Sequence, residues 1–336
     1  MSILDNLAKL EGKWAYVWRP QNMFKGDVGR AIQELKATGT AGIAIKVSNG
    51  TYAYDQDPLL DQMIMGCVQE NISVIFWSYI YLNSPVLEAK AAIKMCTKYK
   101  DVCIAFLIDA EGDAKGKAKQ AKLFAAELKK GLDPLEIPIA LNSYRYPSLH
   151  PELPFTQLRS IGHLDIPQVY YRNTDPISNL ERSYREYAAL CPKLGYEPAG
   201  DMYFEFGVKP TPAAVRRFLE FCRDDPRFDM ALMWSADQCE CTPDLWAAYA
   251  TVVWPVEGKP HTTQSGYTPL PPPLEKPLYA AVVIASVLNV RQGNGIAFPI
   301  LRTLRRGDRC TIYQEASRWC RINPGEWVSH SWIKPL

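Results

Sequence analysis

The segment Phe106-Leu107-Ile108-Asp109-Ala110-Glu111-Gly112 is an apolar run that ends in two carboxylates one residue apart, followed by a glycine. The run predicts a buried strand that brings paired acids to its own carboxyl end. Because strand side chains alternate, Asp109 and Glu111 should point to the same face of the sheet, ~7 Å apart. In a parallel barrel, that end of the strands holds the chemistry. Two acids in one cleft do not ionise independently, so one can stay protonated as a general acid while the other is charged.

The first 254 residues alternate short apolar strands with amphipathic helical stretches, a pattern typical of a parallel sheet covered by helices. Eight strand–helix units in about 250 residues fit an α/β fold of the (β/α)8 TIM-like type. A doubly wound open sheet is the alternative, but no GxGxxG motif follows an early strand, so a dinucleotide site has no support. We expect helices at 27–37, 58–70, 85–99 and 114–130. We expect strands at 14–18, 42–48, 72–81, 102–109, 137–142, 164–171, 202–206 and 230–235.

The composition changes at residues 256–277, where prolines, threonines and glycine replace the periodic pattern. We therefore predict a barrel domain at 1–255, a Pro-rich linker at 256–277 and a small all-β barrel at 278–336. Residues 277–336 carry a net charge of +5, whereas the remainder carries −3. The basic tail could be drawn to an anionic polymer such as nucleic acid or teichoic acid, but an ordinary solvated surface is the interpretation that we favour.

The remaining composition excludes several classes of function. The nine cysteines include no CxxC pair and are expected to be buried free thiols, so we expect neither a metal site nor a cofactor. The four histidines lie in unrelated contexts, which leaves a Ser-His-Asp hydrolase unsupported. No apolar run is long enough to cross a membrane, and the amino terminus has no signal-peptide pattern. We expect a chain made in the cytoplasm, with no membrane or nucleic-acid partner.

Four motifs in the tail resemble a bacterial SH3 domain: LNVRQG (288–293), LRRGD (304–308), WCRI (319–322) and GEWV (325–328). The resemblance implies a module that binds peptidoglycan peptides or other wall components. Tyr313, Trp319 and Trp327, together with Trp332, would supply the aromatic surface for such binding. Two of the three tryptophans are as readily expected in the core of so small a barrel.

The barrel resembles the family 25 glycoside hydrolases, the lysozyme-like muramidases found in many phage endolysins. The motifs are IKVSNG (45–50) followed by DP (57–58), IFWSY (75–79), the acidic strand 106–112 and NSY (142–144). The resemblance implies that Glu111 is the general acid and Asp109 its partner, which stabilises positive charge at the sugar ring or orients the 2-acetamido group of the substrate. It also implies a lysin that acts on the cell wall after release.

The first strand departs from that family, which usually has an aspartate there in a G-x-D-x-S context. This chain has WAYVWRP (14–20) instead. Asp201, Glu205 and Asp237 are possible replacements. Three interpretations stay open: a muramidase with a rearranged carboxylate network, a disabled protein that binds wall glycan, or a hydrolase of another polysaccharide. The acids themselves also have a structural interpretation, as a helix-capping or salt-bridged pair.

Further candidates for substrate binding lie near expected strand ends. Lys46 could hydrogen-bond a sugar, hold Asp109 charged or form a structural ion pair. Aromatic rings could stack on sugars, and amides could bind their hydroxyls. The full set is Lys46, Trp77, Tyr79, Asn142, Tyr144, Gln168, Tyr170, Glu205, Trp234 and Asp237.

Overall fold

The computed structural model describes residues 2–190, 194–255, 277–296, 298–316, 318–323 and 325–336. The chain divides into two compact units, Met1–Pro269 and Leu270–Leu336. The predicted linker at 256–277 lies, except for its last residue, outside the described residues, so its bounds stay a prediction. None of the helices in the described ranges combines the length and the apolar character that a bilayer crossing requires.

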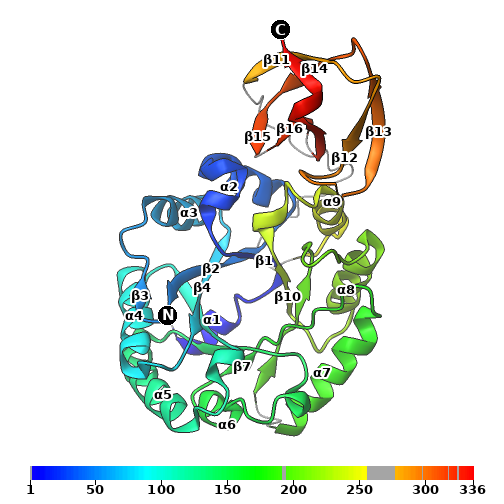
Figure 1. The fold of residues 1–336 in the computed structure, drawn as a ribbon. Helices are drawn as coiled ribbons and strands as arrows, with labels where there is room; N and C mark the ends of the chain where they lie inside the picture. The colour runs from blue at the N-terminus through cyan, green and yellow to red at the C-terminus, as the bar shows by residue number, and fades with distance from the viewer. Residues whose placement is uncertain (1, 191–193, 256–276, 297, 317, 324) are drawn as a thin grey trace. The chain divides into compact units, whose positions relative to one another are not determined.

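The first unit is a closed barrel of parallel strands (Figure 1). Its sheet runs from β8 through β7, β6, β5, β4, β2, β1 and β10 to β9. Because Tyr196 in β8 is followed after two residues by β9, these two short strands share one position, and a bridge from Gln168 to Ala199 helps to close the ring. The strands are β1 (Gly12–Val17), β2 (Gly42–Asn49), β4 (Ser73–Ile80), β5 (Cys103–Ala110), β6 (Ile139–Asn142), β7 (Leu164–Asp165), β8 (Gly195–Tyr196), β9 (Ala199–Asp201) and β10 (Met230–Trp234). A short β3 (Tyr52–Ala53) pairs with β2.

Helices surround this barrel (Figure 1). Several begin where the sequence supplies an N-cap followed by proline, as at Asp57 and Thr211, whose side chains accept hydrogen bonds from the first turn. The helices are α1 (Ile3–Leu7), α2 (Val28–Ala37), α3 (Pro58–Gln69), α4 (Pro85–Lys98), α5 (Ala118–Leu132), α6 (Phe155–Arg159), α7 (Pro176–Leu190), α8 (Pro212–Asp224) and α9 (Pro243–Thr251). The predicted TIM-like fold class is confirmed.

Three predicted elements were misplaced. The seventh strand, predicted at 202–206, lies at Gly195–Tyr196 and Ala199–Asp201, and Pro198 interrupts it because proline has no N–H for the ladder. The sixth strand covers only Leu164–Asp165, and Pro167 has the same effect there. The helix predicted from residue 114 begins at Ala118, since Gly112–Ala114 forms a 3-10 turn and Gly116 has a positive φ of 73°.

Alternation along the strands divides the apolar residues into two layers. Trp14, Ala44 and Leu107 belong to a cluster inside the barrel, whereas their strand neighbours Ala15 and Ile45 pack in the cluster that includes the helices. Side chains of the interior parity near the carboxyl end of each strand must therefore face the mouth of the barrel.

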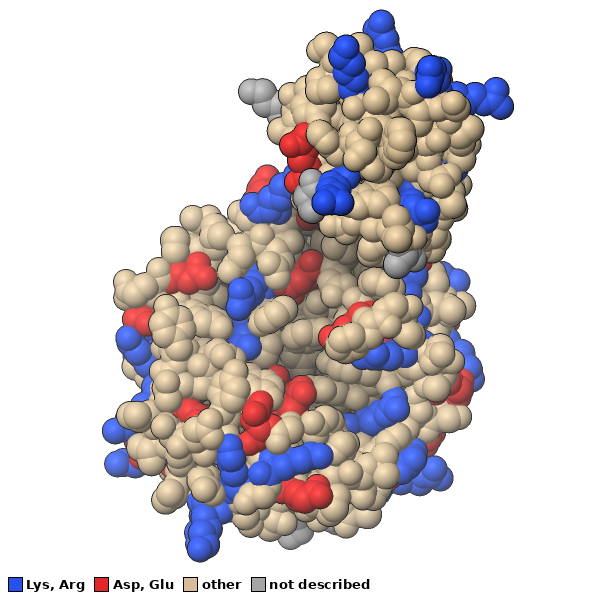
Figure 2. Space-filling model, viewed as in Figure 1, with Lys and Arg blue, Asp and Glu red and all other residues tan. Residues whose placement is uncertain are grey.

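The second unit is an antiparallel β structure built from a three-stranded and a five-stranded sheet. A small apolar core that includes Val283, Val290 and Val328 holds the sheets together. On the face shown in Figure 2, most of the charged side chains of this unit are Lys and Arg, in agreement with its positive net charge. Its strands are β11 (Tyr279–Val283), β12 (Val287–Arg291), β13 (Ile300–Arg305), β14 (Arg309–Ile312), β15 (Gln314–Ala316), β16 (Trp319–Asn323), β17 (Glu326–Ser329) and β18 (Ile333–Pro335).

Candidate active site

The carboxyl end of the barrel contains a cavity of about 590 Å³. Its lining comes from β1, β5, β6 and β10 and from the loops that follow the strands, so segments far apart in the sequence meet there. We call it the acid cavity, after Asp109 and Glu111. Its other lining residues include Tyr16, Asn142, Tyr144, Arg145, His150, Gln168, Tyr170, Arg172, Tyr203, Glu205 and Trp234.

One amide group joins the acids. Gln168 Nε2 lies 3.2 Å from Asp109 Oδ1, 2.7 Å from Glu111 Oε1 and 2.8 Å from Asn142 Oδ1. Because an amide nitrogen has only two hydrogens, it cannot donate fully to all three acceptors. Asn142 is itself oriented, since its Nδ2 donates to Ile166 O at 2.9 Å and to the Tyr16 hydroxyl. The geometry therefore leaves the two carboxyls competing for one donor.

Burial sets the protonation of this pair. It raises the pKa of Asp109 well above the ordinary value, and the charge of Glu111 raises it further. Burial also raises the pKa of Glu111, against the hydrogen bond from Gln168. Asp109 is only 7% exposed, whereas Glu111 is half-buried and nearer to solvent. A pair with these properties can hold one proton between two carboxyls.

Tyr16 occupies the first-strand position, where the sequence has no aspartate. Its hydroxyl accepts from Asn142 Nδ2 and lines the acid cavity. Burial and, after it, the charge of Asp109 raise the pKa of Tyr16 well above its ordinary value, so the first strand supplies a neutral hydroxyl. The alternation of side chains along β1 was a signal for this residue, since Tyr16 lies two residues after Trp14 and therefore points into the barrel as Trp14 does.

The predicted aromatic residues divide between the floor and the wall of the acid cavity. Trp77 is 2% exposed and donates from Nε1 to Ala44 O at 3.2 Å, so it belongs to the interior core beneath the cavity. Its ring lies 5.6 Å from that of Trp234, which does line the cavity. Tyr144 and Tyr170 also line it. Tyr79 does not, and its hydroxyl donates to Asp113 Oδ2 at 2.7 Å.

Asp201, Glu205 and Asp237 are the three candidate replacements for the first-strand aspartate. Asp201 accepts from the N–H groups of Tyr171 and Arg172, and Asp237 accepts from those of Trp18 and Arg19. Burial raises the pKa of each of these two acids to about 6. Glu205 alone of the three lines the acid cavity, where it accepts from Arg172 Nη2 at 2.9 Å. Arg172 and Tyr203 were missed, because their loops follow the misplaced strands.

Lys46 lines a second cavity, of about 340 Å³. We call it the basic cavity, because Lys46 and Arg19 both line it. The rest of the lining comes from the loops after β1 and β2 and from the start of α3, and consists of Trp18, Pro20, Gln21, Tyr52, Tyr54, Gln56, Asp57, Pro58 and Leu60.

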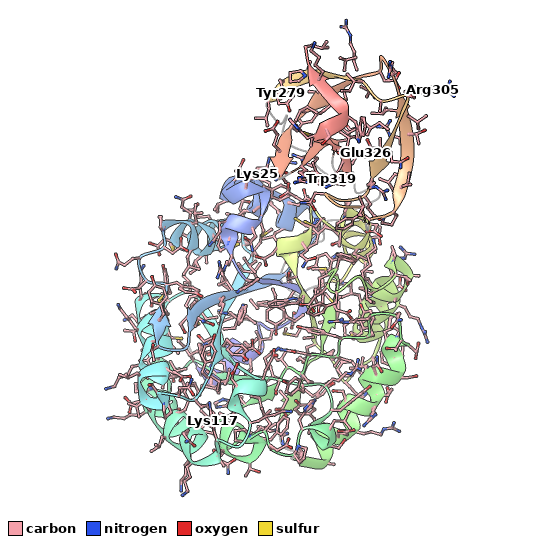
Figure 3. The ribbon with its side chains drawn as sticks, viewed as in Figure 1. Lys25, Lys117, Tyr279, Arg305, Trp319 and Glu326 are labelled. Atoms are coloured by element: carbon pink, nitrogen blue, oxygen red, sulfur yellow. The ribbon has the colours of Figure 1, made fainter. Side chains whose placement is uncertain are left out.

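In the second unit, Tyr313, Trp319 and Trp327 are each half-buried and lie outside the apolar core cluster, and Trp332 is exposed. Figure 3 shows Tyr279 and Arg305 on opposite sides of this unit, with Trp319 and Glu326 between them in the view. Among the described residues, one group of potential metal ligands lies close together, namely Glu315, Cys320 and His330. It is remote in sequence from the acid cavity, and the expectation of a metal-free protein stays a prediction.

Both units are similar to known proteins. Residues 286–334 match the family described as bacterial SH3 domain. The barrel is similar to a family 39 glycoside hydrolase from the gut symbiont Bacteroides cellulosilyticus WH2, with a TM-score of 0.52 and 10% identity over 68% of this chain and 57% of that one. The chain therefore joins a barrel that shares its fold with this glycoside hydrolase to a segment that matches the bacterial SH3 domain family.

Two chitinases match over nearly their whole length. The chitinase from Chromobacterium violaceum ATCC 12472 has a TM-score of 0.51 and 9% identity, over 71% of this chain and 98% of that one. The family 18 chitinase from Pseudoalteromonas aurantia has a TM-score of 0.50 and 10% identity, over 71% and 99%. Likeness at such identities shows a shared fold. This chain spans a little more than half of the family 39 enzyme, and no curated protein matches its sequence.

Proposed function

We propose that the protein is a peptidoglycan-degrading glycoside hydrolase, a muramidase that cleaves the β-1,4 bond between N-acetylmuramic acid and N-acetylglucosamine. The observation that carries the proposal is the pair Asp109 and Glu111, joined through Gln168 in a cavity at the carboxyl end of the barrel. Glycoside hydrolysis uses two carboxyls in different protonation states. The family 25 resemblance of the strand motifs supports the choice of bond.

In this proposal Glu111 is the general acid. It is nearer to solvent than Asp109, and its raised pKa favours the protonated form that can donate to the glycosidic oxygen. Asp109 lies deeper, and burial raises its pKa well above the ordinary value while the charge of Lys46 opposes that rise. The proposed mechanism uses the form of the pair in which the single shared proton is on Glu111. An ionised Asp109 stabilises positive charge that develops at the sugar ring, or orients the 2-acetamido group of the substrate.

The second unit holds the enzyme on its substrate. Bacterial SH3 domains commonly bind wall components, and the basic surface and half-buried aromatic rings of this unit suit such a ligand. Tethering a weakly binding module to a catalytic barrel raises the local concentration of substrate without new contacts in the acid cavity. The proposed partner is peptidoglycan or a related wall glycan.

A second candidate is a protein that binds wall glycan without turnover. The observation that favours it is the neutral hydroxyl of Tyr16 at the first-strand position where the similar family has an acid. It predicts saturable binding to wall glycan and no new reducing ends. Hydrolysis of another polysaccharide is the remaining alternative, and a panel of glycans distinguishes it.

The test is the release of reducing ends from purified peptidoglycan by the wild-type chain, Glu111→Gln and a matched control, Glu220→Gln. Glu220 is exposed on α8, outside the acid cavity. We expect wild type and Glu220→Gln to release reducing ends at equal rates and Glu111→Gln to release almost none. Equal release by all three would remove Glu111 from the mechanism. Release by none, with retained glycan binding, would favour the second candidate.

A further inference from the structure

The amine of Lys46 is buried in an aromatic surround. The side chain is 7% exposed, and its Nζ lies 4.8 Å from the ring centre of Trp77, 5.8 Å from that of Tyr79 and 5.9 Å from that of Trp18. Within the described ranges, no hydrogen bond or ion pair holds this amine. Cation–π contacts offset part of the cost of burying a charge, but they accept no hydrogen bond. The N–H groups of the amine are therefore available to donate hydrogen bonds to a ligand.

Arg19 supplies a second free cation beside it. Its guanidinium lies 5.0 Å from the ring centre of Trp18, and no carboxylate pairs with it in the part of the chain that the structure describes. The backbone at this point is fixed, because Asp237 accepts from the N–H groups of both Trp18 and Arg19 at 2.7 Å. The two cations thus line one cavity, Lys46 from strand β2 and Arg19 from the anchored loop.

The basic cavity has one carboxylate in its lining, and that group is already engaged. Asp57 Oδ1 accepts from Leu59 N at 3.0 Å and from Leu60 N at 3.3 Å, as the N-cap of α3. Two cations therefore face the basic cavity, and neither forms an ion pair with an acid of its lining. Their mutual repulsion and the burial of Lys46 both disfavour this arrangement in the empty protein. A bound anion would offset both.

The basic cavity is linked electrostatically to the acid cavity through Lys46. Burial lowers the pKa of Lys46 to about 8, while the charges of Asp109 and Glu111 oppose that shift, so the amine is within electrostatic reach of both acids. At neutral pH most of the Lys46 side chains remain protonated. A glycan bound at Glu111 could thus place a substituent against Lys46.

We propose that Arg19 and Lys46 form a subsite for a free carboxylate carried by the glycan. This inference rests on the proposed function and deepens it, since it assigns acidic rather than neutral saccharides to the site. A guanidinium can bind a carboxylate in a bidentate manner, and the ammonium of Lys46 adds a charge-assisted hydrogen bond. The rings of Trp18 and Tyr54 complete a cavity of about 340 Å³ around the carboxylate and its sugar.

The experiment measures binding by calorimetry to the full chain carrying Glu111→Gln, so that no probe is consumed. One probe is the tetrasaccharide of alternating N-acetylglucosamine and N-acetylmuramic acid with free lactyl carboxylates. The other is the same tetrasaccharide with these carboxylates converted to methylamides. We expect the free acid to bind about tenfold more tightly, the size of a charge-assisted contact. Equal affinities would overturn the proposal.

Added substitutions locate the subsite. Lys46→Met keeps the apolar stem and removes the charge, and Arg19→Gln changes an exposed side chain; each should bring the affinity ratio close to one. Lys122→Met, exposed on α5, removes a charge elsewhere and should leave the ratio unchanged. If the free-acid tetrasaccharide still binds about tenfold more tightly than the methylamide in both Lys46→Met and Arg19→Gln, the assignment of these residues to the subsite is refuted. Tighter binding of a glycerol phosphate oligomer than of the free-acid tetrasaccharide would also refute it.

The outcome is separable from that of the proposed function. If Glu111→Gln abolishes hydrolysis but the two tetrasaccharides bind equally, the hydrolase stands and the carboxylate subsite fails. If Glu111→Gln hydrolyses peptidoglycan normally while the affinity ratio, then measured with non-hydrolysable thioglycoside forms of the two tetrasaccharides, depends on Lys46, the subsite stands and the assigned acid fails.

Discussion

The acid cavity and the basic cavity lie at the same end of one barrel, but the first contains buried acidic groups and the second contains basic groups. In the acid cavity, two buried carboxyls compete for the amide of Gln168, and burial raises the pKa of both. In the basic cavity, the Lys46 amine has aromatic rings around it and no acceptor among the described residues. Alternation of side chains along the strands directs both Asp109 and Lys46 to the inside of the barrel. The charged and polar groups around each residue then determine its protonation and its hydrogen bonds.

That difference gives the two cavities different expected roles. A carboxyl pair with one shared proton can transfer it, and so the acid cavity is suited to catalysis. Two cations that form no ion pair among the described residues can attract an anionic ligand, and so the basic cavity is suited to recognition. Substitutions in and around the two cavities should therefore differ in the kind and the size of their effects.

The largest effect is expected for Glu111→Gln, which keeps the shape of the side chain and removes the proton donor. The turnover number should fall by about 10²- to 10⁴-fold, the usual contribution of a general acid, with little change in KM. Hydrolysis of a soluble glycan oligomer measures it, with circular dichroism as the check on folding. A loss of less than threefold would assign the acid role elsewhere.

Asp237→Asn should change how stability depends on pH. The pKa of Asp237 is about 6 in the folded protein against an ordinary 3.8, so the folded state binds the proton more readily than the unfolded chain. Stability conferred by that proton is present at low pH and is lost as the pH rises from about 4 to about 6, by up to ~3 kcal/mol. Urea denaturation at pH 4, 5, 6 and 7 should show a flatter profile for the variant. Parallel profiles would contradict the shift.

Gln168→Leu removes the donor that both carboxyls share. Since its hydrogen bonds favour the charged forms, their loss should raise both pKa values and move the bell-shaped profile of turnover to higher pH by about one unit. The measurement is the turnover number of the wild type and of the variant on one soluble substrate as a function of pH. A lower maximum without any displacement would mean that Gln168 contacts substrate without setting the protonation of the pair.

Lys46→Met should produce the smallest shift. The positive charge of Lys46 lowers the pKa of Asp109 and of Glu111 without touching either through a hydrogen bond. Its removal should move the same profile to higher pH by about half a unit, less than for Gln168→Leu. Lys122→Met provides the control for a lost charge. A shift to lower pH would show that the two cavities do not communicate as described.

The sequence predicted the barrel well because its signal is local. Runs such as 103–110 are apolar along their length, and N-caps with proline mark the helices. The same signal failed at 202–206, where Tyr203, Phe204, Glu205 and Phe206 alternate like a strand but form a loop, while the true strand contains Ala199 and Gly200 and has little β-propensity.

The site was predictable only in part, for a related reason. Asp109 and Asn142 could be placed, since each lies near the carboxyl end of a strand whose alternation can be read from the sequence, and Gln168 follows the next strand, β7. Tyr16 was noticed only as the absence of an acid, although its parity directs it inward. Arg19 was missed because it lies on a loop, where its position depends on Asp237 more than 200 residues away in sequence. Contacts of that kind exist only in the folded chain.

Mass spectrometry of purified peptidoglycan, digested with the wild-type chain and with Glu111→Gln in parallel, tests the central claim most directly. The account predicts new fragments that end in reducing N-acetylmuramic acid, present only with the wild type. Fragments ending in reducing N-acetylglucosamine would contradict the assigned bond. The absence of fragments from both proteins, across several wall types, would contradict the hydrolase itself and leave a glycan-binding barrel with Tyr16 at the position of the missing acid.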